Sequence, residues 1–177
     1  MNNILTDISK INFEKLVEKK DPTWTDIVKK NHTDAYNLIP ESFFSVNMLY
    51  MHVQINDIPI TAFVDTGAQI TIMSHSMAKK LGVTDLIWKG YNSTMKGVGE
   101  QKSIGKIFCL DMVIGSSIIP CSFVILENSP DIIFGLDMMK AHGCIIDLKE
   151  KKMKIGDDEV HFLEKKEVTD SGELTFE

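Results

Sequence analysis

The sequence has few cysteines, and nothing in their spacing suggests a cross-linked or metal-bound protein. Its 177 residues include three cysteines, Cys109, Cys121 and Cys144, with no C-x-x-C pair among them. Buried free thiols are therefore expected in place of a disulfide framework or a zinc site. The five histidines are scattered and show no metal-ligand spacing. We predict no metal and no cofactor.

The sequence also lacks long hydrophobic runs and an excess of basic charge. No run is long enough to cross a bilayer, and the first residues do not form a signal-peptide pattern. The formal net charge of −6 disfavours nucleic-acid binding. We expect neither a membrane nor a nucleic acid as partner, and a location in the cytoplasm, with the nucleus as a second compartment. The hydrophobic fraction of 44% is sufficient for a packed core.

Residues 62–74, Ala-Phe-Val-Asp-Thr-Gly-Ala-Gln-Ile-Thr-Ile-Met-Ser, are the stretch most indicative of chemistry. Asp65 follows an apolar strand, and a carboxylate in that position is costly unless it is hydrogen-bonded or chemically used. Thr66 can fix the turn, and Gly67 allows another chain to approach closely. The tripeptide Asp-Thr-Gly alone is common in ordinary turns. The apolar strands on both sides favour a carboxylate held for general acid–base catalysis.

Composition divides the chain into three parts. Apolar residues recur at helical spacing over residues 1–39, which predicts a helical segment whose last helix starts at Thr25 or Asp26. Strand patterns dominate residues 40–164, from an extended strand over residues 43–55 to a closing hairpin over residues 144–155. Residues 165–177 are polar and acidic, so we expect a flexible tail.

Turn and cap signals place the shorter elements of the middle part. Asn56-Asp57 predicts a hairpin turn. Ser74 is a candidate cap for a short helix that Gly82 closes. Three strands are then expected over residues 106–114, 118–126 and 131–134, followed by a short helix over residues 135–142.

A segment rich in glycine follows, beginning with Lys96-Gly97-Val98-Gly99 and ending at Gly105. It lacks the third glycine of a dinucleotide-binding loop and the Gly-Lys-Ser/Thr step of a P-loop. Strand-like residues on both sides favour a β-hairpin over a phosphate site. Glycines at the tip of such a hairpin would allow it to open and close over a substrate.

Two motifs together resemble the retroviral-type (retropepsin) aspartic proteases: residues 63–68, Phe-Val-Asp-Thr-Gly-Ala, and residues 132–135, Ile-Ile-Phe-Gly. The likeness covers about Pro40 to Leu163 and is closer still to the eukaryotic DNA-damage-inducible (Ddi) proteins. That match adds residues 40–43, 48–50, 69–74, 96–99, 104–105, 120–123 and 135–138. The resemblance implies a mainly β, retropepsin-like acid-protease barrel that is closed as a homodimer. The helical segment occupies the place of the family's helical domain.

The number of candidate loops independently indicates a dimer. Aspartic proteases use two carboxylates that face one water and share a proton, because two close like charges cannot both be ionised. The chain offers one credible loop, since Asp170-Ser171-Gly172 has no apolar strand before it. A chain with one such loop must take the second aspartate from a two-fold partner, which predicts an isologous homodimer.

The resemblance implies a role for each matching residue. Asp65 forms the dyad, Thr66 holds the two loops together across the axis, and Gly67 permits their approach. The loop is braced by Ile133, Phe134 and Gly135. The flap and walls that bind substrate are Lys96, Gly97, Val98, Gly99, Ile104 and Ile72. For Ile72, Val98 and Ile104, a place in the ordinary core is the open alternative.

The implied function is an aspartic endopeptidase that binds polypeptide in extended form between flap and floor. The family further implies ubiquitinated proteins and the proteasome as partners. The alternative is a catalytically weak dimeric scaffold of the ubiquitin–proteasome pathway, and a retrotransposon-encoded protease would share the same chemistry. Two departures stand out: the family's ubiquitin-like and ubiquitin-associated domains are not found in these residues, and Tyr91-Asn92-Ser93-Thr94 replaces a segment that usually contains a glycine.

Overall fold

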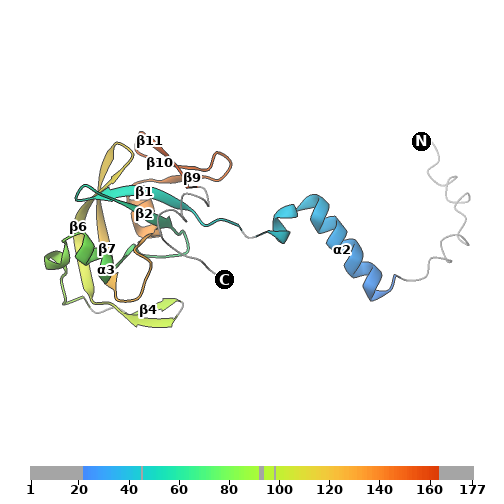
Figure 1. Cartoon of the computed structure of the whole chain (residues 1–177), viewed down its shortest axis with the longest axis horizontal. Helices are drawn as coiled ribbons and strands as arrows, with labels where there is room; N and C mark the ends of the chain where they lie inside the picture. Colours follow the sequence, from blue (N-terminus) through green and yellow to red (C-terminus); the bar gives the residue numbers. More distant parts are fainter. Residues whose placement is uncertain (1–21, 45, 92–93, 98, 164–177) are drawn as a thin grey trace, which may run out of the picture. The chain divides into compact units, whose positions relative to one another are not determined.

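The computed structural model describes residues 22–44, 46–91, 94–97 and 99–163, of which 94–97 and 99–101 are described by their backbone (Figure 1). The chain divides into two compact units, residues 1–46 and 47–177. This boundary lies seven residues beyond the one expected at residue 40. The predicted helices before residue 22, the flap residue Val98 and the predicted tail over residues 165–177 lie outside the described residues.

The described part of the first unit is a helix followed by a short helical turn. Helix α2 spans Trp24–Leu38 and is capped by Thr23, whose hydroxyl accepts from the amide of Asp26 at 3.3 Å. The Asp26 carboxylate accepts in return from the amide of Thr23 at 3.1 Å, which completes a capping box. The helix therefore starts one residue before the predicted Thr25.

The strand predicted to start at Phe43 does not start there. Residues Pro40–Phe43 form the 3-10 helix η2, which proline at the first position favours. The ring of Phe43 packs edge-on against His32 and Tyr36 of α2, with centroids 4.8 Å and 5.8 Å away. Aromatic contact with the preceding helix thus overrides the strand pattern at this point.

The chain is mainly β and its second unit is a retropepsin-like barrel, as the resemblance implied. The six strands close within the single chain, and the expected closure as a homodimer stays a prediction. Its strands lie in the order β1-β2-β8-β3-β7-β6. They span Tyr50–Ile55 (β1), Ile58–Val64 (β2), Ile72–Ser74 (β3), Gly105–Ile114 (β6), Ser117–Leu126 (β7) and Ile132–Phe134 (β8). The pairing of Gln54 with Val113 closes the barrel between β1 and β6.

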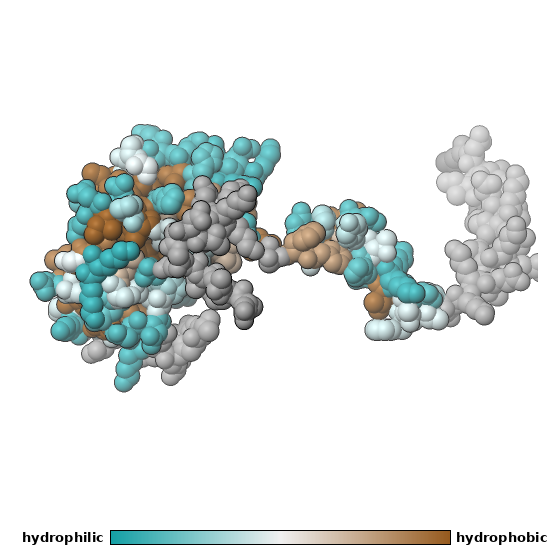
Figure 2. All heavy atoms as spheres, in the orientation of Figure 1, coloured by the Kyte–Doolittle hydropathy of each residue, from teal (hydrophilic) through white to brown (hydrophobic). Residues whose placement is uncertain are grey.

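Alternating side chains explain how the barrel fills. In β1 the residues Met51, Val53 and Ile55 are buried while their neighbours His52 and Gln54 are exposed, the period-two pattern of a half-buried strand. The predicted turn between β1 and β2 is present: Asn56 and Asp57 have φ angles of 50° and 61°, which suit a tight hairpin. In the space-filling view, brown hydrophobic residues of this unit show between teal hydrophilic ones (Figure 2).

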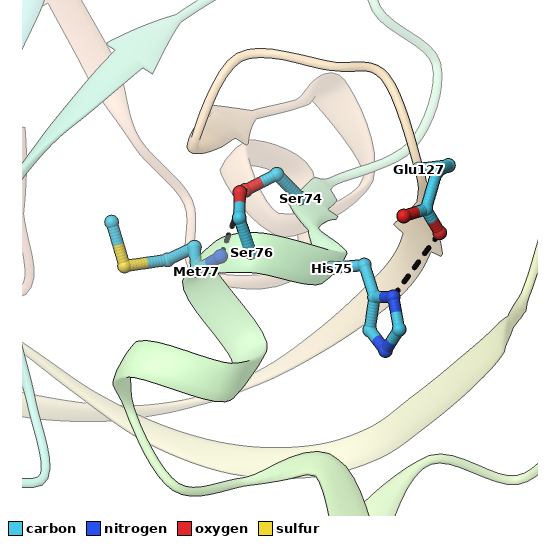
Figure 3. Close-up of polar contacts among 5 residues, drawn as sticks. All are labelled: Ser74, His75, Ser76, Met77 and Glu127. Atoms are coloured by element: carbon cyan, nitrogen blue, oxygen red, sulfur yellow. Dashed lines mark hydrogen bonds and ion pairs between the residues drawn. The ribbon is translucent and has the colours of Figure 1, made fainter.

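Two short α-helices flank the strands that meet at the catalytic-loop candidate. Helix α3, His75–Lys80, is capped by Ser74, whose hydroxyl accepts from the amide of Met77 at 3.0 Å (Figure 3). The predicted closing residue Gly82 has a φ of 69°. Helix α4 spans Leu136–Ala141, and the 3-10 helix η3 spans Thr84–Leu86. In the described residues, no helix combines the length and apolar character needed to cross a membrane.

A separate three-stranded sheet follows α4. The predicted closing hairpin is present as β9, Ile145–Asp147, and β10, Lys152–Ile155. A further strand, β11, Asp158–His161, pairs with β10 and was not predicted. Asp158 accepts hydrogen bonds from the hydroxyls of Ser116 and Ser117, so this sheet is joined to the turn between β6 and β7.

The cysteine prediction is partly wrong. Cys121 is buried and Cys144 is half-buried, but Cys109 is exposed. The register between β6 and β7 shifts between Ile107 and Leu110, so two residues of β6 oppose one residue of β7. Such a bulge breaks the alternation of side chains and turns Cys109 outward. Burial, with the nearby Asp137 as a further cause, raises the pKa of the Cys121 thiol to about 12.

Candidate active site

Asp65 lies immediately after β2, where the predicted strand ends. The Val64 amide donates to the carbonyl of Leu49 at 2.8 Å, and the Asp65 amide donates to the carbonyl of Phe134 at 3.1 Å. The second bond continues the ladder between β2 and β8 by one residue. The carboxylate is therefore attached to a backbone that is already fixed by the sheet, and the residue is half-buried.

The turn after Asp65 fixes the orientation of the carboxylate. The Gly67 amide donates to Asp65 Oδ1 at 2.8 Å, and the Ala68 amide donates to the Asp65 carbonyl at 3.3 Å. A Cβ atom at Gly67 would stand 3.1 Å from Asp65 Oδ1, so a side chain here would crowd the carboxylate. Thr66 and Gly67 are exposed, which leaves this side of the turn open to another molecule.

Strand β8 lies between the strands that enter and leave the loop. It runs parallel to β2, with Phe63 opposite Ile133, and antiparallel to β3, with Ile72 opposite the same Ile133. Phe134 is fully buried below the loop. The structure thus brings the three predicted brace residues, 133–135, directly against the Asp65 loop.

Gly135 is the position at which β8 approaches the loop most closely. A Cβ atom there would lie 2.6 Å from both the carbonyl carbon and the carbonyl oxygen of Ile70. Those atoms belong to the backbone and cannot rotate away, so only glycine fits. The next residue, Leu136, donates its amide to the Ala68 carbonyl at 2.8 Å.

Two residues of this brace, Thr71 and Asp137, were not predicted as site residues. Thr71 is 1% exposed; its hydroxyl accepts from the Gly135 amide at 2.9 Å and donates to Asp137 Oδ1 at 2.7 Å. Asp137 Oδ1 also accepts from the Met138 amide at 2.8 Å. The sequence did contain a sign of this role, because Thr71 stands within an apolar run. A hydroxyl that is buried there needs a hydrogen-bond partner.

A second polar contact holds the segment that leads into β8. The Ser74 amide donates to the Asp131 carbonyl at 3.0 Å, and the Ser74 hydroxyl donates to Asp131 Oδ1 at 3.0 Å. Next to it, His75 Nδ1 lies 3.1 Å from Glu127 Oε2, as the close-up shows. These contacts join the start of α3 to the loop between β7 and β8.

The predicted substrate-binding residues fall in two places. Ile72 is half-buried on β3, opposite Ile133, and Ile104 is half-buried and packed against the core. The predicted flap is a two-stranded hairpin of β4, Thr94–Gly97, and β5, Gly99–Lys102. Lys96 lies in β4, and Gly97 pairs with Gly99 across the hairpin.

The base of the flap is closed by a backbone bridge. Trp88 and Lys106 exchange two hydrogen bonds, with N···O distances of 2.9 Å and 3.2 Å. The Ser103 hydroxyl donates to the Tyr91 carbonyl at 3.1 Å. A Cβ atom at Gly105 would lie 2.6 Å from the Trp88 carbonyl oxygen, so glycine is required for this close approach.

The arrangement provides one carboxylate, Asp65, with a fixed position and an exposed turn beside it. In the described residues, no group of three or more His, Cys, Asp or Glu side chains is placed to hold a metal ion. One carboxylate can accept or donate a proton, but sharing a proton across an attacked water requires two. Asp65 of one chain can supply one of those two carboxylates.

Comparison with known proteins identifies the class. A family model described as aspartyl protease matches residues 40–147. Protein DDI1 homolog 2 of Danio rerio is 41% identical over 152 residues, or 84% of this chain and 37% of the relative. DNA damage-inducible protein 1 of Saccharomyces cerevisiae is 41% identical over 146 residues, or 82% of this chain and 33% of the relative.

A solved structure supports the same assignment. The retroviral protease-like domain of Ddi1 from Leishmania major superposes with a TM-score of 0.60 and 35% identity, covering 67% of this chain and 98% of that domain. The chain therefore belongs to the aspartyl protease family. Within that family it is a retropepsin-like member of the DNA-damage-inducible (Ddi) group, and it spans about a third of the length of these curated relatives.

Proposed function

We propose that this chain is an aspartic endopeptidase that becomes complete as a homodimer and hydrolyses extended polypeptide. The observation that supports it most is the fixed carboxylate of Asp65, held by the Gly67 amide and by β8. Two copies related by a two-fold axis would place two such carboxylates around one water. One acts as base while the other keeps the proton, so activity is expected to favour acidic to neutral pH.

The substrates and partners extend the proposal. On the strength of the Ddi relationship, we infer that the substrates are ubiquitinated proteins of the proteasome pathway, with the proteasome as a partner in the cytoplasm and nucleus. The peptide would lie extended between the β4–β5 hairpin and the surface near Ile72 and Ile133, adding a strand to the site. Thr66, exposed beside Asp65, would contact its counterpart across the dimer axis.

The direct test compares cleavage of an unfolded and a polyubiquitinated substrate by wild type and by Asp65→Asn. We expect cleavage by wild type only. Asp170→Asn is the matched control, because Asp170 begins the other Asp-x-Gly sequence, and this variant should cleave as wild type does. Equal cleavage by wild type and Asp65→Asn would remove Asp65 from the mechanism.

A mixing experiment tests whether two chains share one site. If each active site needs Asp65 from both chains, adding an equal amount of Asp65→Asn to wild type should lower the total activity to about half after subunit exchange. An unchanged activity would mean that each chain works alone. A dimer that cleaves neither substrate would instead support the scaffold function.

A further inference from the structure

The charge of this acidic chain is unevenly distributed. Residues 75–106 contain two acidic residues, Asp85 and Glu100, and six basic ones, so this segment has a formal charge of +4. The rest of the chain then has a charge of −10, since the total is −6. The basic residues of the segment are Lys79, Lys80, Lys89, Lys96, Lys102 and Lys106. A basic region is therefore present although the net charge argued against one.

Aromatic side chains cluster around one of these lysines. Lys106 Nζ lies 5.4 Å from the centre of the Tyr91 ring and 5.3 Å from the centre of the Phe108 ring. The Trp88 and Phe108 rings are in contact, with centroids 5.6 Å apart. We call Trp88, Tyr91, Lys106 and Phe108 the aromatic–lysine surface. Large apolar groups of this kind are costly to leave in water.

The backbone holds these side chains outward. Trp88 is 54% exposed and Phe108 is 59% exposed. Phe108 follows the buried Ile107 and faces outward by the ordinary alternation of strand β6. Gly90 packs against the indole, since a Cβ atom there would be 2.6 Å from Trp88 Cζ2. The exposed positions thus follow from strand alternation, the Trp88–Lys106 bridge and a glycine contact.

We propose that the aromatic–lysine surface binds an acidic, extended segment of polypeptide substrate, away from the Asp65 loop. Apolar side chains of the segment would pack on Trp88 and Phe108, and its carboxylates would approach Lys106 and the exposed Lys89. Tryptophan and tyrosine are enriched among the energetic centres of protein interfaces. The lysines would add charge complementarity to an acidic partner. The Trp88–Lys106 bridge closes the base of the flap, so a segment bound here is held beside it.

The identification of the bound segment as a substrate rests on the proposed function. The test therefore measures binding in the absence of cleavage. The chain has two tryptophans, and Trp24→Phe leaves Trp88 as the sole tryptophan. In a Trp24→Phe, Asp65→Asn protein, the emission of Trp88 is followed during titration with a synthetic peptide of alternating Glu and Phe or Leu. We expect a saturable change, with affinity at least roughly fivefold weaker when salt rises from about 50 to 300 mM.

Matched peptides and variants locate the contact. A peptide with every Glu replaced by Lys should bind at least roughly tenfold more weakly, because the charges then repel. Lys106→Gln and Phe108→Ala should each weaken binding of the acidic peptide by roughly three- to tenfold. Lys149→Gln is the control, since Lys149 is an exposed lysine in the turn after β9, and it should bind as the parent does.

Three results would overturn the proposal: equal binding of the acidic and basic peptides, unchanged binding by both Lys106→Gln and Phe108→Ala, or a Trp88 emission change with protein concentration alone. The last would show that a second copy covers the surface. Binding of the acidic peptide by a protein whose wild type cleaves nothing would retain the surface and remove the protease function. Cleavage by wild type, together with no change in Trp88 emission on adding the acidic peptide, would retain the protease function and remove the surface.

Discussion

The Asp65 loop and the β4–β5 flap both depend on glycine, but they use it in opposite ways. At Gly135, the missing side chain lets β8 press against the backbone of Ile70. Around this contact the Thr71 hydroxyl accepts from the Gly135 amide, the Phe134 carbonyl accepts from the Asp65 amide, and the Leu136 amide donates to the Ala68 carbonyl. In the flap, Gly97 and Gly99 face each other in a two-stranded sheet of its own.

The difference lies in what surrounds each glycine. The loop is enclosed by two neighbouring strands, whereas the described contacts of the flap concentrate at its base, at the Trp88–Lys106 bridge and the Ser103 hydroxyl. A catalytic carboxylate must keep its position to within a fraction of an ångström. A flap that admits polypeptide must move. We therefore expect a rigid backbone at Gly135 and a hairpin that moves at Gly97 and Gly99.

Gly135→Ala tests the tight enclosure of the Asp65 loop and should have the largest effect. The new Cβ atom would meet the Ile70 backbone at 2.6 Å, so β8 or the loop must shift. We expect unfolding to become easier by about 3 kcal/mol. Cleavage should fall roughly a hundredfold or more, because displacing a catalytic group by about an ångström has that effect. Chemical denaturation and a peptide-cleavage assay measure the two.

The matched change on the flap side provides the contrast for Gly135→Ala. Gly99→Ala adds the same methyl group to a two-stranded hairpin whose described contacts lie at its base, and it should leave the unfolding free energy within about 0.5 kcal/mol of wild type. A Gly99→Ala protein as destabilised as Gly135→Ala would contradict the comparison.

Thr71→Val tests the hydrogen bonds of the loop without changing its shape. Valine removes the hydroxyl that accepts from the Gly135 amide and donates to Asp137, leaving a buried amide without this partner. Such a loss costs about 1–3 kcal/mol. We expect an unfolding free energy lower by about 2 kcal/mol, while Thr71→Ser, which keeps the hydroxyl, should lose less than half of that. Equal losses would contradict this and show that the methyl group contributes as much to stability as the hydroxyl does.

Gly105→Ala tests the flap through its base. The added Cβ atom would lie 2.6 Å from the Trp88 carbonyl oxygen and from Ile87 Cγ2, so the Trp88–Lys106 bridge should open. We expect a stability loss of about 1 kcal/mol. Hydrogen exchange should speed up in residues 94–102 and stay unchanged in β8. Faster exchange in β8 would mean that loop and flap are mechanically coupled.

Much of this fold follows from sequence, because strand alternation and turn residues act locally. The turn at Asn56-Asp57, the capping by Ser74 and the flap hairpin were predicted from neighbouring residues alone. The Thr71–Asp137 bond joins residues 66 positions apart and exists only because β8 lies between β2 and β3. Strand β11 was missed because its sequence, Asp-Glu-Val-His, is largely polar. The roles given to Asp65, Thr66 and the flap residues stay predictions, and so does the homodimer.

The smallest expected effect comes from a surface contact with the same chemistry as Thr71–Asp137. The hydroxyls of Ser117 and Ser116 hold the pKa of the Asp158 carboxyl below its usual 3.8. A carboxyl whose pKa is lower in the folded state stabilises the fold above the unfolded pKa, and this contribution is lost as pH falls through the folded value. Asp158→Asn should therefore lower Tm slightly near neutral pH and leave it unchanged once the pH is below the folded pKa of Asp158, where wild type has lost the same charge.

The exposed Asp157, next in the chain, provides the control, because Asp157→Asn should leave Tm nearly as it is in wild type. If Asp158→Asn lowered stability as much as Thr71→Val does, a difference in burial would not determine how much each contact stabilises the fold. The half-buried Asp158 carboxylate competes with solvent for its hydroxyl partners, whereas the Thr71 hydroxyl, 1% exposed, has no solvent to replace its bonds when they are lost. Comparing the two variants in one protein therefore contrasts a fully buried hydroxyl with a half-buried carboxylate, and the larger loss is expected at the hydroxyl that braces the Asp65 loop.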